Sequence, residues 1–407
     1  MAIPKPVPLF PSYEELSDFN WGSYPDLKVH LDQLPDWCAV QWGWATDFLL
    51  YVGRNKSDHT FTRFRSEVEK FLLWVNLVTQ KRVDTLRKSD VLDYAEFFFK
   101  PPQSWIGLVN VEKFKRVGGE YRENPEWRPF RYISDTTVPD KKQYRPSQQS
   151  MQAMFTAITA FYKFLMDEEV CLGNPAQIAK KDCKRLIKDT QIRKTKRLDK
   201  EQWAFLLEVA TQMANEDPTF ERNLFLIAAM KTMFLRISEL SERDDWIPIM
   251  SHFWQDDDKN WWLNVYGKGR KLRDVSVPDG FILYLERYRI SRGLPELPTS
   301  HERQPIIAKS RGTGGMTARQ LSRLVDHVLS KAYLIKLNNE GSKAAQVFKD
   351  ATSHWLRHTG ASLEIDRGRA LKDVSEDLGH SSMATTDSVY VQASAKNRAK
   401  SGKSREV

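Results

Sequence analysis

The sequence predicts a mostly α-helical protein with a small antiparallel β-sheet, divided into two domains. Apolar residues recur at three- and four-residue steps in long segments on both sides of a basic stretch near residues 179–198. Two alternating segments flank the glycine-containing turn in NWWLNVYGKGRKLRDVSVP, which is typical of a β-hairpin. The length of 407 residues is enough for two or three domains with substantial cores.

Composition narrows the class of protein. Lys and Arg total 62 against 53 Asp and Glu, and the net charge of +9 favours a polyanionic partner. Three scattered cysteines, Cys38, Cys171 and Cys183, suit a reducing compartment. No run approaches the roughly 18 to 20 apolar residues of a membrane span, and prolines interrupt the N-terminus where a signal peptide needs an apolar helix. We therefore expect a cytoplasmic protein with no membrane partner.

The first half of the chain predicts a helical domain. Residues 1–34 lack a clear period and are expected to form an N-terminal extension. The helical pattern covers DWCAVQWGWATDFLLYVG, whose Gly53 suits a helix end, and continues through SDHTFTRFRSEVEKFLLWVNLV, RKSDVLDYAEFFFK and SQQSMQAMFTAITAFYKFLMDEEV. A stretch at 101–146 is irregular. We expect a helical domain over 35–178 with an insert at 101–146.

Residues 179–198 carry far more Lys and Arg than Asp. They predict either a solvated linker or a basic segment that lies on a phosphate backbone, and the second interpretation is favoured because the segment joins two helical blocks. Lys194, Lys196 and Arg197 are its candidate DNA contacts.

Residues 199–407 predict a second domain in which helices surround the hairpin. Helical patterns occur in DKEQWAFLLEVATQMA, ERNLFLIAAMKTMFLRISELS, TARQLSRLVDHVLSKAYLI, SHWLRHTGASLEIDRG and ALKDVSEDLGHSS. Arg236 is expected late in the second of these helices, and Lys268 at the hairpin turn.

Several polar residues in this second domain have ordinary explanations when taken singly. An arginine late in a helix often caps it, and a lysine in a glycine-rich turn is usually solvated. His354 and His358 have the i, i+4 spacing of a zinc pair, but the metalloprotease motif needs Glu where the sequence has Trp355. No acidic or cysteine cluster offers a third ligand, so we expect no metal site. A lone tyrosine such as Tyr390 is usually a packing residue.

Taken together and in order, the segments LRISEL, GKGRKLRDVSVP, HWLRHTGAS and LGHSSMATT, followed by Tyr390, resemble the tyrosine recombinase (phage integrase) family over about residues 36–400. The resemblance implies a two-domain DNA clamp, with a helical core-binding domain and an α+β catalytic domain. The interval from His380 to Tyr390 is one residue longer than in common members.

The resemblance also implies roles for these residues. Tyr390 attacks a DNA phosphodiester and forms a 3′-phosphotyrosyl intermediate, while Arg236, Arg357 and His380 stabilise the transition state. Lys268 is the candidate general acid and His354 the candidate general base, and Glu239 orients Arg236. The candidate phosphate contacts beside the turn are Arg270, Lys271 and Arg273. No role is assigned to His358.

The expected function is therefore site-specific recombination of double-stranded DNA by an integrase of a mobile element. The expected assembly is a homotetramer on DNA, with a possible accessory protein or partner recombinase and with no cofactor, ATP or metal. The protein would then be nucleoid-associated and of bacterial or phage origin. Two alternatives stay open: a type IB topoisomerase-like enzyme, and a non-catalytic DNA-binding protein on the same fold.

Overall fold

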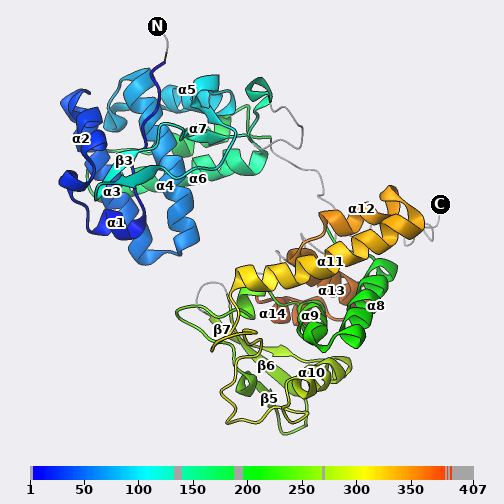
Figure 1. Cartoon of the computed structure of the whole chain (residues 1–407). Coiled ribbons are helices and arrows are strands. Elements are labelled where there is room, and N and C mark those ends of the chain that lie inside the picture. The colour runs from blue at the N-terminus through cyan, green and yellow to red at the C-terminus, as the bar shows by residue number, and fades with distance from the viewer. Residues whose placement is uncertain are drawn as a thin grey trace. The chain divides into compact units, whose positions relative to one another are not determined.

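A computed structural model describes residues 3–132, 140–187, 196–267 and 271–380, together with 383 and 386. The chain divides into two compact units, residues 1–190 and 191–407, each with its own hydrophobic core (Figure 1). The division falls inside the segment 179–198 that was predicted as a linker. Helix α7 extends to Asp182, however, so the start of this segment is helical.

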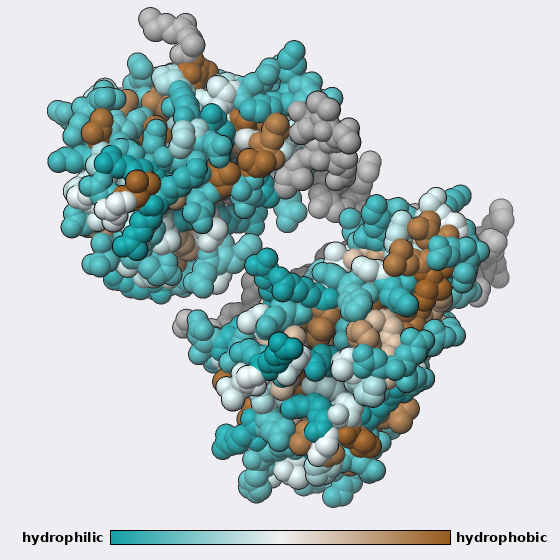
Figure 2. Space-filling view, in the orientation of Figure 1, coloured by the Kyte–Doolittle hydropathy of each residue, from teal (hydrophilic) through white to brown (hydrophobic). Residues whose placement is uncertain are grey.

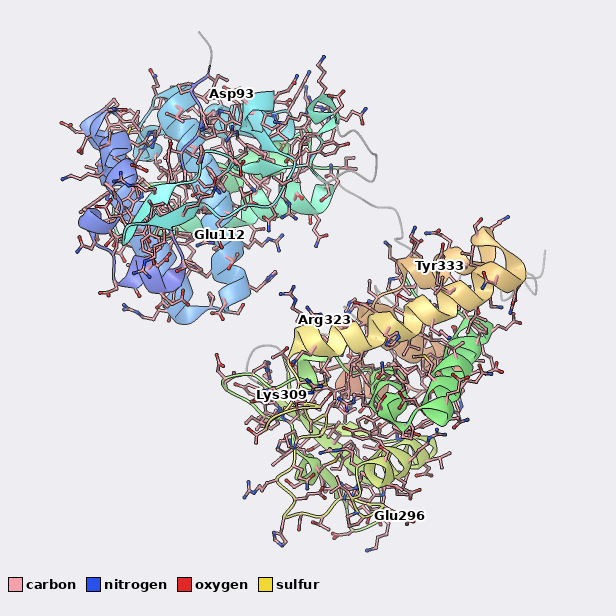
Figure 3. The ribbon with its side chains drawn as sticks, in the orientation of Figure 1. Asp93, Glu112, Glu296, Lys309, Arg323 and Tyr333 are labelled. Atoms are coloured by element: carbon pink, nitrogen blue, oxygen red, sulfur yellow. The ribbon has the colours of Figure 1, made fainter. Side chains whose placement is uncertain are left out.

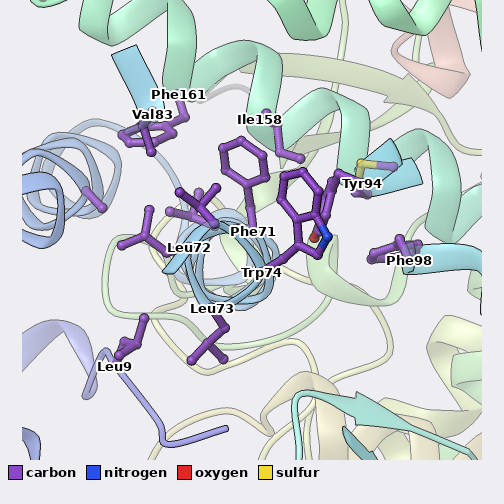
Figure 4. Close-up of a cluster of buried hydrophobic side chains, with 14 of the residues drawn as sticks. Leu9, Phe71, Leu72, Leu73, Trp74, Val83, Tyr94, Phe98, Ile158 and Phe161 are labelled. Carbon is purple, nitrogen blue, oxygen red and sulfur yellow. The ribbon is translucent and has the colours of Figure 1, made fainter. Parts of the chain in front are cut away.

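The first unit is built mainly from helices. The apolar periodicity predicts four of them, namely α3 Asp36–Asn55, α4 Asp58–Trp74, α5 Lys88–Phe99 and α6 Gln148–Asp167. The sequence pattern did not predict α1 Tyr13–Ser17 and α2 Pro25–Asp32, which lie in the expected N-terminal extension, or α7 Pro175–Asp182. Helix α4 packs against both α3 and α6. Its Phe71 and Trp74 meet Tyr94 of α5 with ring centroids 5.1 and 5.2 Å apart (Figure 4). The core of this unit is therefore unusually aromatic around α4.

The N-terminal segment packs into the core of the first unit. Leu9 and Phe10 are fully buried, and both of their backbone N–H groups donate to one oxygen of Glu69, at 2.9 and 3.2 Å. The other oxygen of Glu69 pairs with Lys113 Nζ at 2.6 Å. Because a buried carboxylate needs partners, Glu69 joins the N-terminal segment and the 101–146 insert to α4.

The insert at 101–146 contains regular structure that the sequence pattern did not reveal. Its strands are β1 Ile106–Gly107, β2 Phe114–Val117, β3 Glu120–Glu123 and β4 Phe130–Arg131. Strands β2 and β3 form an antiparallel hairpin, and β1 pairs with β4 in parallel. Trp105 and Phe130 are buried in the same core as the helices. Strands of two to four residues are too short to show a period.

Gly53 does not end its helix, so that part of the prediction is wrong. Helix α3 continues to Asn55. A Cβ atom at position 53 would lie 2.2 Å from the ring of Tyr13. The glycine is needed because α1 approaches α3 closely at this point.

The second unit surrounds a small sheet with helices. Its helices are α8 Lys200–Glu216, α9 Glu221–Thr232, α10 Asp279–Ser291, α11 Ala318–Glu340, α12 Ser342–Asp350, α13 Ser353–Arg367 and α14 Leu371–Leu378. Its strands are β5 Phe253–Gln255, β6 Trp261–Gly267 and β7 Lys271–Ser276. Strands β6 and β7 pair antiparallel from Trp262–Ser276 to Gly267–Lys271, which confirms the predicted hairpin. Strand β5 adds an unpredicted third member at the edge next to β6.

Helix α9 lies at the centre of the second unit and packs against α8, α10, α11 and α13. Leu224 to Met230 are all buried, which fits a helix surrounded by others. Helix α13 approaches so closely that a Cβ at Gly360 would lie 1.8 Å from the carbonyl oxygen of Lys231. Helix α9 ends at Thr232, so Arg236 lies beyond the helix in an extended conformation, contrary to expectation.

The face of each unit that Figure 2 shows is mostly polar. Hydrophilic residues cover most of the visible face of each unit (Figure 2). Along α11, Arg323 is exposed, whereas Tyr333 is partly buried against the core (Figure 3). Within the described ranges, every helix is too short or too polar to cross a lipid bilayer.

Replacing Gly360 with Ala should destabilise the second unit by about 2 kcal/mol, because α13 would have to move away from α9. The measurement is hydrogen exchange of α9 and α13 peptides in increasing urea, which reports on this unit alone. Gly280→Ala is the matched control, since a Cβ there meets no atom within 4 Å among the described residues. Equal stability of the two variants would contradict the close helix contact.

Candidate active site

Arg357 is a deeply buried charge of the candidate site. It lies on α13, and only 1% of its surface is exposed. Its Nη1 donates to the carbonyl oxygen of Phe234 at 2.5 Å, and its Nη2 donates to that of Leu378 at 2.6 Å. A buried guanidinium requires such acceptors. Arg357 therefore joins the turn after α9 to the end of α14.

The turn after α9 has an unusual backbone conformation at Phe234. Its φ of +52° lies in the left-handed region, which is uncommon for a residue with a large side chain. The Phe234 side chain is buried with Ala361, Val374 and Leu378. This small apolar cluster and the hydrogen bond from Arg357 hold the turn that delivers the chain to Arg236.

A single carboxylate, Glu239, holds three arginines together. It is 1% exposed and lies in the short turn that follows Arg236. Glu239 accepts from the backbone N–H of Arg236 at 2.8 Å and from its Nη1 at 2.9 Å. Arg273 donates to both carboxylate oxygens, at 2.9 and 3.1 Å, and Arg357 Nη1 lies 3.9 Å away.

The ionised form of Glu239 is favoured in spite of its burial. Burial alone raises the pKa of the carboxyl group, but the hydrogen bonds and charge of Arg273 oppose this. The backbone N–H of Arg236 and the charge of Arg357 act in the same direction, and the pKa of Glu239 lies below its usual value. Three guanidinium groups thus surround one carboxylate, which leaves an excess of positive charge at the site.

Arg273 has a different position from the one expected for an exposed phosphate contact. Its side chain is 15% exposed and makes a bidentate ion pair with Glu239. Its Nε also donates to the carbonyl oxygen of Asp377 at 3.1 Å. Arg273 comes from β7, so it connects the hairpin to the turn of Arg236 and to α14. Nothing in the sequence pattern distinguished it from its basic neighbours.

The end of α14 is fixed on strand β7 by Asp377, another residue that sequence reasoning missed. Asp377 accepts from the backbone N–H of Ser276 at 3.0 Å and from its hydroxyl at 2.7 Å. Arg369 donates to the same carboxylate at 2.6 Å. His380 follows α14 directly, after Gly379 with a φ of +62°. A Cβ at Gly379 would lie 2.8 Å from Arg273 Nε, so only glycine fits between them.

Three histidines lie close to the arginines. The rings of His354 and His358 are 4.3 Å apart in an edge-to-face arrangement. The pKa of His354 is lowered by partial burial and by the charges of Arg357 and Arg236. Burial, His354, Arg357 and His380 lower the pKa of His358 to about 4. Near neutral pH both rings are therefore uncharged.

His380, two residues after Leu378, lies beside Arg357. Its Nε2 lies 3.5 Å from Arg357 Nη2. Burial, followed by the charges of Arg357, Arg236 and Arg273, lowers the pKa of His380 to about 4. Arg236 itself is 26% exposed and is the most accessible of the three guanidinium groups. An anion that approaches the site can therefore meet Arg236 first.

The structure brings together most of the described residues that the sequence singled out. Arg236, Glu239, His354, Arg357 and His380 gather at one place. Lys196 and Lys271 are exposed, whereas Arg197 pairs with Asp366 at 2.9 Å. The remaining candidates lie outside the described residues, namely Lys194, Lys268, Arg270 and Tyr390.

Within the described part of the chain, no group of three or more His, Cys, Asp or Glu side chains is arranged to hold a metal ion. Around the Glu239 carboxylate, the polar groups of the site are cationic donors and neutral imidazoles, a set that suits an oxyanion.

Curated relatives resemble the chain over most of its length. The tyrosine recombinase XerC of Chlorobaculum parvum is 27% identical over 351 residues, which cover 82% of this chain and 92% of the relative. XerC of Leptospira interrogans is 28% identical over 255 residues, covering 62% of this chain and 70% of the relative.

Solved structures share the fold. The XerH site-specific recombinase bound to its palindromic difH substrate has a TM-score of 0.58 at 14% identity, and the match covers 96% of this chain and 93% of that chain. The Tn1549 transposon integrase in complex with circular intermediate DNA has a TM-score of 0.52 at 15% identity, covering 91% and 99%.

The sequence model of the phage integrase family matches residues 196–397, which include every residue of the site described above. This match agrees with the family suggested by LRISEL, HWLRHTGAS and LGHSS and with the recombinases that are similar over most of the chain. The protein therefore belongs to the phage integrase family and is a tyrosine recombinase.

Proposed function

We propose that this tyrosine recombinase cleaves and rejoins DNA strands at specific sites through a covalent 3′-phosphotyrosyl intermediate on Tyr390. The observation that carries the proposal is the gathering of three guanidinium groups around Glu239, beside histidines that are uncharged near neutral pH. Such a site provides fixed positive charge for a phosphate and neutral groups for proton transfer.

The chemistry of the phosphodiester explains why these residue types are needed. A phenol has a pKa of about 10 and is a weak nucleophile at neutral pH. The transition state of phosphoryl transfer places negative charge on the non-bridging oxygens, and fixed cationic donors stabilise that charge. In the proposed mechanism Arg236 and Arg357 supply these donors, and Glu239 and Arg273 hold them in place.

Proton transfer completes the proposed mechanism. The lowered pKa of His354 keeps its ring uncharged and able to accept a proton from the attacking tyrosine. Lys268, which follows β6 in the sequence, is the proposed acid that protonates the 5′-hydroxyl leaving group. The hairpin that carries it is fixed by Arg273 on Glu239 and by Ser276 on Asp377. The phosphotyrosyl bond conserves the energy of the broken strand, so that rejoining needs no ATP.

The proposed partner is double-stranded DNA that carries a recombination site. The similar XerH and Tn1549 integrase structures contain DNA, which supports this proposal. The exposed Lys196 and Lys271 are proposed phosphate contacts, together with Lys194 and Arg270. We further propose that the protein forms a homotetramer on DNA and acts with an accessory protein or a partner recombinase. Its proposed role is that of the integrase of a mobile element.

Tyr390→Phe should abolish covalent attachment to DNA while leaving DNA binding unchanged. The test incubates the full chain with a pool of nicked duplexes that includes the borders of its own genetic element, and then detects a denaturation-resistant adduct. Exchange of strands between two duplexes distinguishes recombination from relaxation of one duplex. An adduct of normal yield with Tyr390→Phe would show that another residue is the nucleophile.

Lys268→Ala should slow cleavage by about 10² to 10⁴ if Lys268 is the general acid. A bridging 5′-thiol substrate should restore the rate, since a thiol with a pKa of about 8.5 leaves without protonation. Lys271→Ala is the matched control, because this exposed lysine lies on the same hairpin. We expect its effect to be on binding, with no rescue by the thiol. Absence of rescue for Lys268→Ala would assign the acid to another group.

Glu239→Gln should destabilise the second unit by about 3 to 5 kcal/mol, because it removes the negative charge that three guanidinium groups share. Cleavage by the folded fraction should also fall. Glu364→Gln is the control, since Glu364 pairs at 3.6 Å with the largely exposed Arg367 and should matter by less than about 1 kcal/mol. Urea unfolding and single-turnover cleavage measure the two effects. Equal losses of stability and of cleavage rate in the two variants would show that Glu239 does not hold the arginines in place.

A further inference from the structure

Two linked hydroxyl groups lie on the side of His380 away from Arg357, and one of them contacts the ring. Thr386 is fully buried, and its Oγ1 lies 2.8 Å from Nδ1 of His380. The same hydroxyl donates to Oγ of Ser375 at 2.9 Å. Ser375 lies on α14 and is 4% exposed. A buried chain of polar atoms thus runs from Arg357 through His380 and Thr386 to Ser375.

The backbone fixes this arrangement at its α14 end. The carbonyl oxygen of Ser375 accepts from the backbone N–H of His380 at 3.2 Å, while the carbonyl of Glu376 accepts from Gly379 at 2.8 Å. Ser375 therefore contacts His380 through its carbonyl and Thr386 through its hydroxyl. The imidazole of His380 is placed between Arg357 and Thr386 with little freedom to rotate.

Arg357 determines the direction of each hydrogen bond between it and Ser375. A guanidinium carries only donors, so Arg357 Nη2 can bond to Nε2 of His380 only if Nε2 is unprotonated. With a pKa of about 4, the ring is neutral near pH 7, and its one proton must then lie on Nδ1. Nδ1–H donates to Thr386, and Thr386 in turn donates to Ser375, the direction that the geometry of that contact favours.

We propose that Thr386 and Ser375 are positioning residues that hold His380 as the tautomer protonated on Nδ1, so that Nε2 accepts a hydrogen bond from Arg357. In the protein without DNA, His380 then orients a guanidinium. This role differs from the phosphate donor suggested by the resemblance, because a bare Nε2 cannot donate to a phosphate oxygen. The tautomer is a property of the free protein, and its consequence for cleavage rests on the proposed function.

The tautomer can be measured directly in the full-length protein. Labelling its eight histidines with ¹⁵N and recording long-range ¹H–¹⁵N correlations at pH 7 shows which nitrogen of each ring is protonated. The signals that disappear in His380→Gln belong to His380. We expect a single form with the proton on Nδ1. A predominant Nε2–H form in the unmodified protein would overturn the proposal.

Two variants remove the hydroxyl chain at different points. Thr386→Val replaces the acceptor of Nδ1–H by a methyl group, and Ser375→Ala leaves the Thr386 proton free to turn toward Nδ1. Each should raise the share of the Nε2–H form by about tenfold, the factor that one hydrogen bond of ordinary strength carries. Thr386→Ser keeps the hydroxyl and should restore the original tautomer. Unchanged His380 signals in both Thr386→Val and Ser375→Ala would show that Arg357 alone sets the tautomer.

Ser362→Ala is the matched control for Ser375→Ala. Ser362 is also buried, at 1% exposure, on the adjacent helix α13. Its hydroxyl has no hydrogen-bond partner among the described residues, so its loss should leave the His380 tautomer unchanged. A shift of equal size in this variant would mean that any buried serine change disturbs the ring, and the proposal would fail.

Cleavage of a nicked duplex in a single turnover tests the consequence of the tautomer. Thr386→Val should slow Tyr390-dependent cleavage in proportion to the share of the Nδ1–H form that it loses, with unchanged DNA binding, and Thr386→Ser should restore the rate. If the unmodified protein forms no adduct, the proposed function fails while the spectroscopic result still decides the tautomer. If the adduct forms and Thr386→Val cleaves at the full rate, the positioning role is wrong although the proposed function stands.

Discussion

The candidate site depends on the buried carboxylate of Glu239. Three guanidinium groups from separate parts of the second unit would repel one another without it, and Glu239 is 1% exposed. Its ionised form persists because the neighbouring arginines outweigh the cost of burial. A carboxylate in this position therefore does not cancel the cationic site. The carboxylate reduces the repulsion among the three guanidinium groups, so that they can lie close together.

The contacts of Glu239 and Asp377 also make the candidate site rigid. Arg273 reaches Glu239 and the carbonyl of Asp377, while the Asp377 carboxylate holds Ser276 of the hairpin. Buried polar groups keep their partners because losing one leaves the other unsatisfied. The hairpin, the turn after α9 and the end of α14 are thus tied to each other. Residues carried by these elements hold their spacing before any ligand arrives.

The same charges set the protonation of the histidines. Burial together with Arg357 and Arg236 lowers the pKa of His354 and His380, so that neutral imidazoles stand beside permanent cations. A neutral ring has one donor and one acceptor, and its neighbours decide which nitrogen is which. At His380 these neighbours include an arginine at Nε2 and Thr386 at Nδ1. The cationic environment and the hydroxyl chain thus act on the same ring.

The sequence by itself determined most helices of both units, the hairpin and the family, since apolar periodicity, a glycine turn and short ordered motifs are local patterns. Only the tertiary structure decided why Gly53 lies inside a helix and why Arg273 faces Glu239. It also decided that Thr386 contacts His380 and that the insert forms short strands. Each of these depends on which residues of other elements come near, often more than 30 positions away. A local sequence pattern cannot predict such a neighbour, because the burial and the pairing of side chains are decided when the elements pack together.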